Sequence, residues 1–134
     1  MRLNIYTDGG ARGNPGPAGI GVAIFDEQFH QVASVKKYLG EKTNNQAEYE
    51  AVIAALERAV ELKATELRFF LDSELVVRQL GGQYKIKNGN LAPLAGKVLS
   101  LKNRFSSVTF SHIPREKNQL ADALENQAID EALN

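Results

Sequence analysis

The sequence predicts an α/β domain built on a mixed five-stranded sheet with helices on both faces. Short loops join the first three predicted strands, which favours an antiparallel meander. The later strands alternate with helical segments, and a helix between two strands lets them pair in parallel through a right-handed crossover. The expected order is β-β-β-α-β-α-α-β-α, and it covers residues 1–134 as a single domain.

Apolar or alternating stretches mark the five strands. The segment Leu3-Asn4-Ile5-Tyr6-Thr7 alternates, whereas the segment from Ile20 to Phe25 is almost continuously apolar. A loop rich in glycine and proline separates these two strands at residues 9–19. The predicted strands cover residues 3–7, 20–25, 30–39, 66–71 and 108–111.

The longest helix is predicted from Thr43 to about Lys63. Thr43 and Gln46 have the spacing of a capping box at its start. An apolar stripe then recurs at helical spacing, formed by Val52, Ala55, Leu56 and Ala59. Glu48 lies four residues before the first residue of this stripe, so its carboxylate is in phase with the buried face. A glutamate is rarely buried without a partner, which predicts a cation nearby.

Three further helices are expected after the fourth strand and around the fifth. They cover residues 73–80, residues 91–104, and residues 118 to nearly the end of the chain. Gly81-Gly82 ends the first of them. The last helix is expected to bury a stripe formed by Ala121, Leu124, Ala128 and Ala132, with Asp122 beside it.

Charge is balanced overall but unevenly distributed. The chain has 16 basic and 16 acidic residues, yet no Asp or Glu occurs between Leu75 and Arg115. That span carries seven cations: Arg78, Lys85, Lys87, Lys97, Lys102, Arg104 and Arg115. A neutral protein with a basic half can present one face to a polyanion.

Cysteine is absent, which excludes disulfides and thiolate metal ligands and suits a reducing compartment. The sequence shows no apolar run of signal-peptide or membrane-spanning length. We therefore expect a cytoplasmic protein without membrane association. No obligate protein partner is evident, and a monomer is expected.

Four acidic residues stand where a site is expected in an α/β sheet. Asp8 and Asp72 end predicted strands, and Glu48 and Asp122 lie near the start of helices. Singly, each has an ordinary explanation as a turn former, a helix cap or an exposed acid. Together they can meet at the carboxyl ends of the strands. All-oxygen ligands without cysteine or clustered histidine indicate Mg²⁺ or Mn²⁺, and a pair of such ions is the arrangement for phosphoryl chemistry.

Four motifs in matching order resemble type 1 ribonuclease H. They are Thr7-Asp8-Gly9-Gly10 with the loop from Gly13 to Gly19, Thr43-Asn44-Asn45-Gln46-Ala47-Glu48, Leu71-Asp72-Ser73, and the segment from His112 to Asn118 with Ala121-Asp122. The resemblance covers about residues 2–130. It implies the ribonuclease H-like fold and a metal-dependent endonuclease. Such an enzyme cuts the RNA strand of an RNA–DNA hybrid and leaves a 5′ phosphate and a 3′ hydroxyl.

The resemblance also implies roles for individual residues. Asp8, Glu48, Asp72 and Asp122 would hold two Mg²⁺ ions, for which Mn²⁺ can substitute. His112, ten residues before Asp122, would sit on a mobile loop and assist proton transfer or product release. The expected contacts to the hybrid are Asn14, Thr43, Asn44, Asn45, Lys85, Lys87, Arg115 and Asn118, with Lys97 as a further phosphate contact.

Two alternatives stay open beside this interpretation. A nucleic-acid-binding module on the same fold would be expected to lack one of the metal-binding acids, and all four are present here. Activity on double-stranded RNA is a further alternative. The chain lacks the long, tryptophan-containing basic protrusion that some members of the family carry, since it has no Trp and its segment from Gly81 to Asn90 is short.

Overall fold

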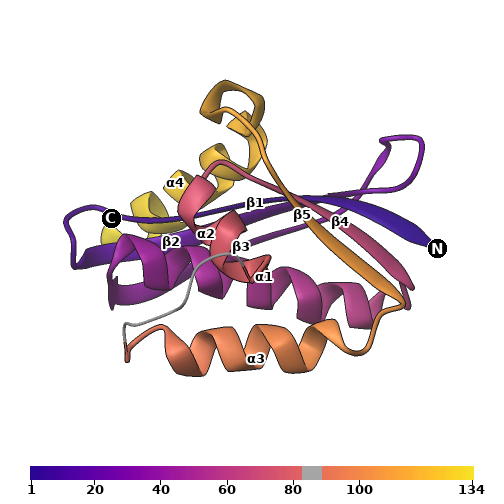
Figure 1. The fold of residues 1–134 in the computed structure, drawn as a ribbon. Coiled ribbons are helices and arrows are strands. Elements are labelled where there is room, and N and C mark those ends of the chain that lie inside the picture. The colour runs from indigo at the N-terminus through magenta and orange to yellow at the C-terminus, as the bar shows by residue number, and fades with distance from the viewer. Residues whose placement is uncertain (83–88) are drawn as a thin grey trace.

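The computed structural model describes residues 1–82 and 89–134 and confirms the predicted element order (Figure 1). The strands are β1 (Arg2–Ala11), β2 (Gly16–Phe25), β3 (Gln31–Lys42), β4 (Glu66–Leu71) and β5 (Ser107–His112). The helices are α1 (Asn44–Glu61), α2 (Glu74–Leu80), α3 (Ala92–Lys102) and α4 (Gln119–Leu133), with a short 3₁₀ turn at Arg115–Lys117.

The sheet has the predicted mixed topology. Its strand order is β3-β2-β1-β4-β5. The pairs β1–β2 and β2–β3 are antiparallel, which confirms the meander, and the pairs β1–β4 and β4–β5 are parallel. Strand β1 therefore lies at the centre, where the meander meets the parallel half.

Helices cover both faces of the sheet, as predicted. Figure 1 shows α4 on one face and α1 on the other, with α3 packed on the outer side of α1. The covering of both faces explains why β2 is buried almost continuously from Ala18 to Ile24, since a strand between two layers has no solvent side. Among the described residues, the helices are all too short or too polar to cross a bilayer.

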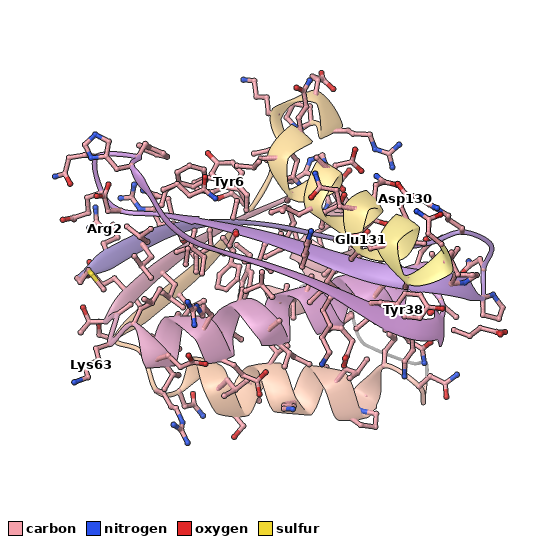
Figure 2. All side chains as sticks on the ribbon, turned by 180° about the vertical axis from the view of Figure 1, so that it is seen from behind. Arg2, Tyr6, Tyr38, Lys63, Asp130 and Glu131 are labelled. Carbon is pink, nitrogen blue, oxygen red and sulfur yellow. The ribbon has the colours of Figure 1, made fainter. Side chains whose placement is uncertain are left out.

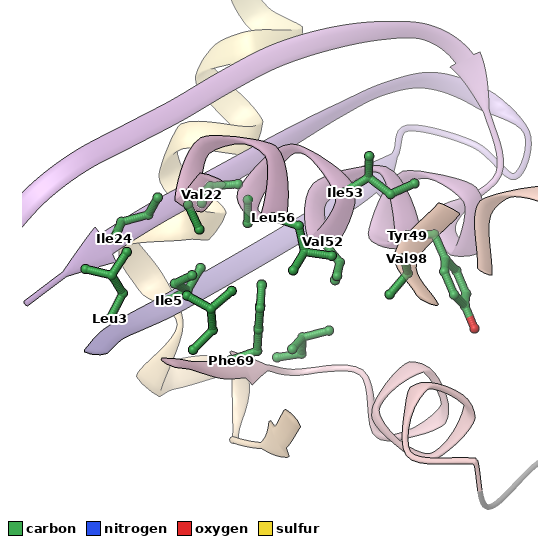
Figure 3. Close-up of a cluster of buried hydrophobic side chains, with 14 of the residues drawn as sticks. Leu3, Ile5, Val22, Ile24, Tyr49, Val52, Ile53, Leu56, Phe69 and Val98 are labelled. Atoms are coloured by element: carbon green, nitrogen blue, oxygen red, sulfur yellow. The ribbon is translucent and has the colours of Figure 1, made fainter. Parts of the chain in front are cut away.

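The main core lies between the sheet and α1 (Figure 3). Leu3 and Ile5 of β1 alternate toward this layer, and Phe69 of β4 joins them fully buried. The helix contributes the predicted stripe of Val52, Ala55, Leu56 and Ala59, all inaccessible to solvent. Each large aliphatic side chain buried in this way stabilises the fold by roughly 1.5–3 kcal/mol relative to exposure.

The predicted capping box fixes the start of α1. The Thr43 hydroxyl accepts from the Gln46 backbone N–H at 3.1 Å, and the Gln46 side chain accepts from the Thr43 N–H at 2.9 Å. These two bonds satisfy groups that would otherwise have no partner at the helix end. The first turn of α1 is thereby ordered at the place where it approaches β1.

Strand β1 is longer than predicted. It continues through Asp8 to Ala11, so Asp8 lies inside the strand and pairs with Gly21 of β2. The expectation that Asp8 ends the strand is therefore wrong. Gly9-Gly10 suggested a break, but both residues lie in the strand, because the absence of side chains there lets neighbouring helices approach the sheet.

The buried face of α4 also differs from the prediction. Ala121 and Ala128 are buried as expected, but Ala132 is exposed. Its remaining buried positions are Glu125 and Ile129. The true stripe follows the spacing i, i+4, i+7, i+8, and an acidic residue occupies its second position.

Ion pairs tie the outer half of α4 to the sheet and the glycine-rich loop. Lys36 of β3 lies 2.7 Å from Glu131, and Arg12 lies 2.7 Å from Asp130. Figure 2 shows Asp130 and Glu131 on the outer part of α4, in the layer above the meander. Because all four side chains are partly exposed, each pair contributes only about 0–1 kcal/mol.

We predict that Gly21→Ala lowers the melting temperature by several degrees. A Cβ atom at Gly21 would lie 2.0 Å from the Ala121 carbonyl oxygen and 2.6 Å from the Glu125 nitrogen, so the backbone of α4 must move. Overpacking of this kind typically costs about 1–3 kcal/mol. Thermal unfolding followed by circular dichroism measures the change.

Gly96→Ala is the matched control, because Gly96 lies inside α3 and a Cβ atom there meets nothing within 4 Å. This change should raise stability slightly, by about 0.5–1 kcal/mol, as alanine is the better helix former. Equal melting temperatures for wild type and Gly21→Ala would show that α4 does not pack directly on β2.

Candidate active site

The sheet brings Asp8 and Asp72 together at the place where its parallel half ends. Thr7 and Leu71 form the last parallel pair between β1 and β4, and each acid directly follows one of them. Both side chains are half-buried. Adjacent parallel strands lie about 4.8 Å apart, so the two carboxylates are neighbours.

Glu48 joins this pair through a close helix–strand contact. A Cβ atom at Gly9 would lie 2.2 Å from the Ala47 carbonyl oxygen and 2.5 Å from the Glu48 nitrogen, so the first turn of α1 rests directly on the β1 backbone. Glu48 lines one small pocket together with Asp8 and Asp72. Its Oε2 atom is buried and has no hydrogen-bond partner.

Asp122 and Glu125 of α4 approach Asp8 from the opposite face. One carboxylate oxygen from each of these three residues can be chosen so that all lie within 4.8 Å of one another. The Asn126 amide donates to the Asp122 carboxylate at 3.3 Å and so helps to fix it. The four predicted acids thus meet, and Glu125 is a fifth that the sequence analysis missed.

The position of Glu125 was detectable in the sequence by its phase. It lies four residues after Ala121 and three before Ala128, both of which were expected on the inner face of α4. The same argument that singled out Glu48 on the long helix therefore applies to Glu125.

Burial and mutual repulsion raise the pKa values of three of these acids. Burial, reinforced by the charges of Asp72 and Glu125, raises the pKa of Asp8 to about 9. Burial also raises the pKa of Glu48 to about 7, although a hydrogen bond from Ser73 opposes the shift. Burial and the charge of Asp122 raise the pKa of Glu125 to about 7. A cluster of this kind is ionised at neutral pH only when a cation compensates it.

The donor set fits hard divalent cations. All five side chains offer carboxylate oxygens, which Mg²⁺ and Mn²⁺ prefer. The buried Glu48 Oε2 atom has no hydrogen-bond partner, and the ligand oxygens of Asp8, Asp122 and Glu125 lie within 4.8 Å of one another. Asp8 belongs to both groups, so the arrangement suits two ions that share this residue.

An open polar cavity of about 580 Å³ lies over the acids. It is lined by all five acids of the cluster, by Arg12 and Arg115, and by Asn44 and Asn126. Arg115 is exposed, and its charge acts on Glu48. Once bound metal compensates the charge of the acids, the guanidinium groups of Arg12 and Arg115 can hold an anion in the cavity.

Asn118 is hydrogen-bonded to Asp72. It is 1% exposed, and its amide donates to the Asp72 carboxylate at 3.1 Å and to the Thr7 carbonyl at 2.9 Å. This placement favours a role in orienting Asp72 over the direct substrate contact that was expected. The bonds also explain why Asn118 precedes α4 without capping it through its side chain.

Asn14 and Asn44 are both exposed, and Asn44 lines the cavity. Asn14 accepts from the Asn44 N–H at 3.0 Å, and the Asn44 side chain accepts from the Ala11 N–H at 2.8 Å. These bonds hold the glycine-rich loop against the start of α1. Thr43 is occupied by the capping box, and Asn45 is half-buried beside it.

The remaining candidates lie at the periphery or outside the described residues. His112 is the last residue of β5, exposed and paired with Leu71, so the expected loop position is wrong. It is not among the described residues that line the acidic cavity. Lys97 lies 3.7 Å from Glu57 on α1. Lys85 and Lys87 fall outside the residues that the structure describes.

Comparison with known proteins places this chain in a family. Residues 6–128 match the family described as reverse transcriptase-like. A protein of Mycobacterium tuberculosis described as bifunctional is 42% identical over 133 residues, and Ribonuclease HI of Halobacterium salinarum is 39% identical over 131. Each alignment covers 98% of this chain, but the chain spans only 36% of the length of the first relative and 66% of the second.

A solved structure agrees over nearly the full length of both chains. LC11-RNase H1, isolated from compost and solved in complex with an RNA/DNA hybrid, superposes with a TM-score of 0.95 at 50% identity. The match covers 98% of this chain and 99% of that one. By its sequence, its sheet topology and this agreement, the chain belongs to the type 1 ribonuclease H family.

Proposed function

We propose that this protein is a metal-dependent endonuclease that hydrolyses the RNA strand of RNA–DNA hybrids and leaves a 5′ phosphate and a 3′ hydroxyl. The observation that carries the proposal is the convergence of Asp8, Glu48, Asp72 and Asp122 on one polar cavity that Arg12 and Arg115 also line. The LC11-RNase H1 relative, solved with an RNA/DNA hybrid, supports this choice of substrate. The absence of cysteine is in keeping with action in the cytoplasm.

The chemistry assigned to the site needs two divalent cations. When bound, such a pair lowers the pKa of the attacking water and stabilises the charge on the leaving oxygen. Asp8 would contact both ions, Glu48 and Asp72 one of them, and Asp122 the other. Asn118 would hold the Asp72 carboxylate in a single orientation through its 3.1 Å bond. Ligands with fixed orientation lower the reorganisation needed at the moment of reaction.

The substrate would enter over the cavity, with phosphates near Arg115 and Arg12. Asn44, which lines the cavity, and the adjacent Asn14 and Asn45 would contact the RNA strand, whose 2′ hydroxyls distinguish it from DNA. His112, paired with the Leu71 residue that directly precedes Asp72, would assist proton transfer or product release, since an imidazole can both accept and donate a proton. Lys85 and Lys87 remain candidates for further phosphate contacts.

Cleavage of labelled duplexes tests the proposal directly. RNA–DNA, RNA–RNA and DNA–DNA duplexes of one sequence are incubated with the protein in Mg²⁺ and in EDTA. We expect the RNA strand of the hybrid to be cut in Mg²⁺ and to stay intact in EDTA. Binding of the hybrid without cleavage in either Mg²⁺ or Mn²⁺ would instead identify a binding module, and equal cutting of RNA–RNA would extend the substrate class.

We predict that Asp8→Asn, Glu48→Gln and Asp72→Asn each abolish most cleavage while the fold persists. An amide keeps the shape of the side chain but binds a divalent cation weakly. Glu27→Gln is the matched control, because Glu27 is an exposed residue of the β2–β3 turn. The site is misassigned if two of the three variants retain more than about a tenth of wild-type turnover, a barrier change under roughly 1.4 kcal/mol.

Without metal, the protein should lose stability as the pH rises from about 5 to about 9. The pKa values of Asp8, at about 9, and of Glu48 and Glu125, at about 7, lie above their ordinary values. The folded state therefore holds more protons than the unfolded chain in this window, and raising the pH favours unfolding. Melting temperatures measured across the window in EDTA check this.

Mg²⁺ or Mn²⁺ should restore the stability at the alkaline end, because the ions bind only the folded cluster. The Asp8→Asn/Asp72→Asn double variant should show both a flatter pH profile in EDTA and little gain from the ions. A metal-induced gain of equal size in this variant and in wild type would indicate non-specific ion binding.

Arg115→Ala should weaken hybrid binding and flatten its dependence on salt. One phosphate contact changes the slope of log affinity against log salt concentration by about 0.9 for duplex DNA. Arg104→Ala is the control, since Arg104 is exposed in the loop that follows α3. Binding is measured over a salt series with the inactive Asp8→Asn protein as background. An unchanged slope for Arg115→Ala would remove this residue from the phosphate path.

A further inference from the structure

Glu125 is a buried acid that the family resemblance did not include. It lies three residues after Asp122 on α4, so both carboxylates leave the same side of the helix. Its exposed fraction is 8%, the lowest among the five acids of the cluster. A glutamate with so little solvent contact needs a compensating partner.

The surroundings of Glu125 supply negative charge where a cation is needed. Its ligand oxygen lies within 4.8 Å of those of Asp8 and Asp122. Arg12 is the positive side chain that acts on it, but the Arg12 guanidinium makes its 2.7 Å contact with Asp130 and donates to Asn126. Among the ion pairs of the described residues, none includes Glu125. The buried carboxylate thus has the Asp8 carboxyl as its hydrogen-bond partner and no cation in contact.

Strand β1 leaves space for the Glu125 carboxylate at Gly10. Gly10 lies two residues after Asp8, on the same side of the strand. A Cβ atom at Gly10 would lie 2.6 Å from the Glu125 Oε1 atom and 3.3 Å from its Cδ atom. Any side chain at this position would displace the carboxylate, so the lack of one allows Glu125 to reach Asp8.

The cluster divides into two overlapping groups. Asp8, Glu48 and Asp72 line one pocket, whereas Asp8, Asp122 and Glu125 form the oxygen triad on the side of α4. Asp8 is common to both. Without Glu125, the second group would consist of two acids, against three in the first.

We propose that Glu125 is a fifth metal ligand, which joins Asp8 and Asp122 in holding the cation on the α4 side of the site. The inference rests on the proposed metal-dependent function. Its consequence is that both cations are held by three protein carboxylates, with Asp8 shared. The ion on the α4 side is then retained by the protein alone, before a substrate phosphate adds its own oxygens.

Mn²⁺ binding to the substrate-free protein tests this assignment. Wild type, Glu125→Gln and the control Glu27→Gln are titrated with Mn²⁺, and bound ion is measured by electron paramagnetic resonance and by water-proton relaxation. Glu125→Gln should weaken binding of one Mn²⁺ at least tenfold and increase the number of water molecules on the retained ion. Glu27→Gln should match wild type in both measurements.

Melting temperatures separate a ligand from a merely structural residue. In EDTA, Glu125→Gln should melt at or above the wild-type temperature, because one of several repelling charges is gone. In Mn²⁺ its gain should be smaller than that of wild type. A lower melting temperature in EDTA together with an undiminished Mn²⁺ gain would overturn the proposal and show that Glu125 serves packing.

Glu125→Asp covers the case in which the glutamine variant does not fold. It keeps the charge but shortens the side chain by one methylene, so Mn²⁺ affinity should fall below that of wild type. Wild-type affinity and hydration in Glu125→Asp, or in Glu125→Gln, would overturn the assignment. Failure of the proposed function has a different signature: wild-type protein that binds Mn²⁺ but leaves the hybrid uncut.

Discussion

Repulsion among the carboxylates around Asp8 is the constraint on which the rest of the structure depends. Burial first, and then the charges of the neighbouring acids, raise the pKa values of Asp8, Glu48 and Glu125, so full ionisation of the cluster without a cation is unfavourable. The sheet and α1 form a continuous apolar core, and its burial holds the strands and helices that carry these acids in place. The site is thus an unfavourable arrangement maintained by favourable packing elsewhere.

Close contacts between the helices and the strand backbones bring the acids together. Strand β1 carries Asp8 at the centre of the sheet, α1 rests on it at Gly9 from one face, and α4 rests on the neighbouring β2 at Gly21 from the other. Each contact brings a helix nearer than any side chain would allow, and each helix delivers acids to the same point. Asp8, Glu48, Asp122 and Glu125 therefore lie beside the closest contacts between the helices and the sheet.

Local patterns in the sequence were sufficient for much of this arrangement. The capping box at Thr43 and the stripe of α1 predicted both the helix and the inward phase of Glu48, because these signals depend only on spacing along one element. The extension of β1 through Asp8 was not predictable in the same way. Gly9-Gly10 breaks an isolated strand, and only the helices packed against it explain its presence inside one. Glu125 was missed because the apolar stripe of α4 was traced through alanine and leucine, although its phase matched the buried face.

The basic residues beside the cavity matter more for phosphate binding than the number of basic residues in one half of the chain. Within the basic half, Lys97 lies near Glu57 and Lys102 lies over the Phe110 ring, so part of that charge is already engaged within the protein. Arg12 and Arg115 instead stand beside the acids. When all five carboxylates are ionised and no metal is bound, they outnumber these two guanidinium groups, and a phosphate is repelled. Two divalent cations reverse the balance, leaving a net positive charge of one. Under the proposed function, binding of metal and binding of nucleic acid therefore favour each other, and by linkage each ligand raises the affinity for the other by the same factor.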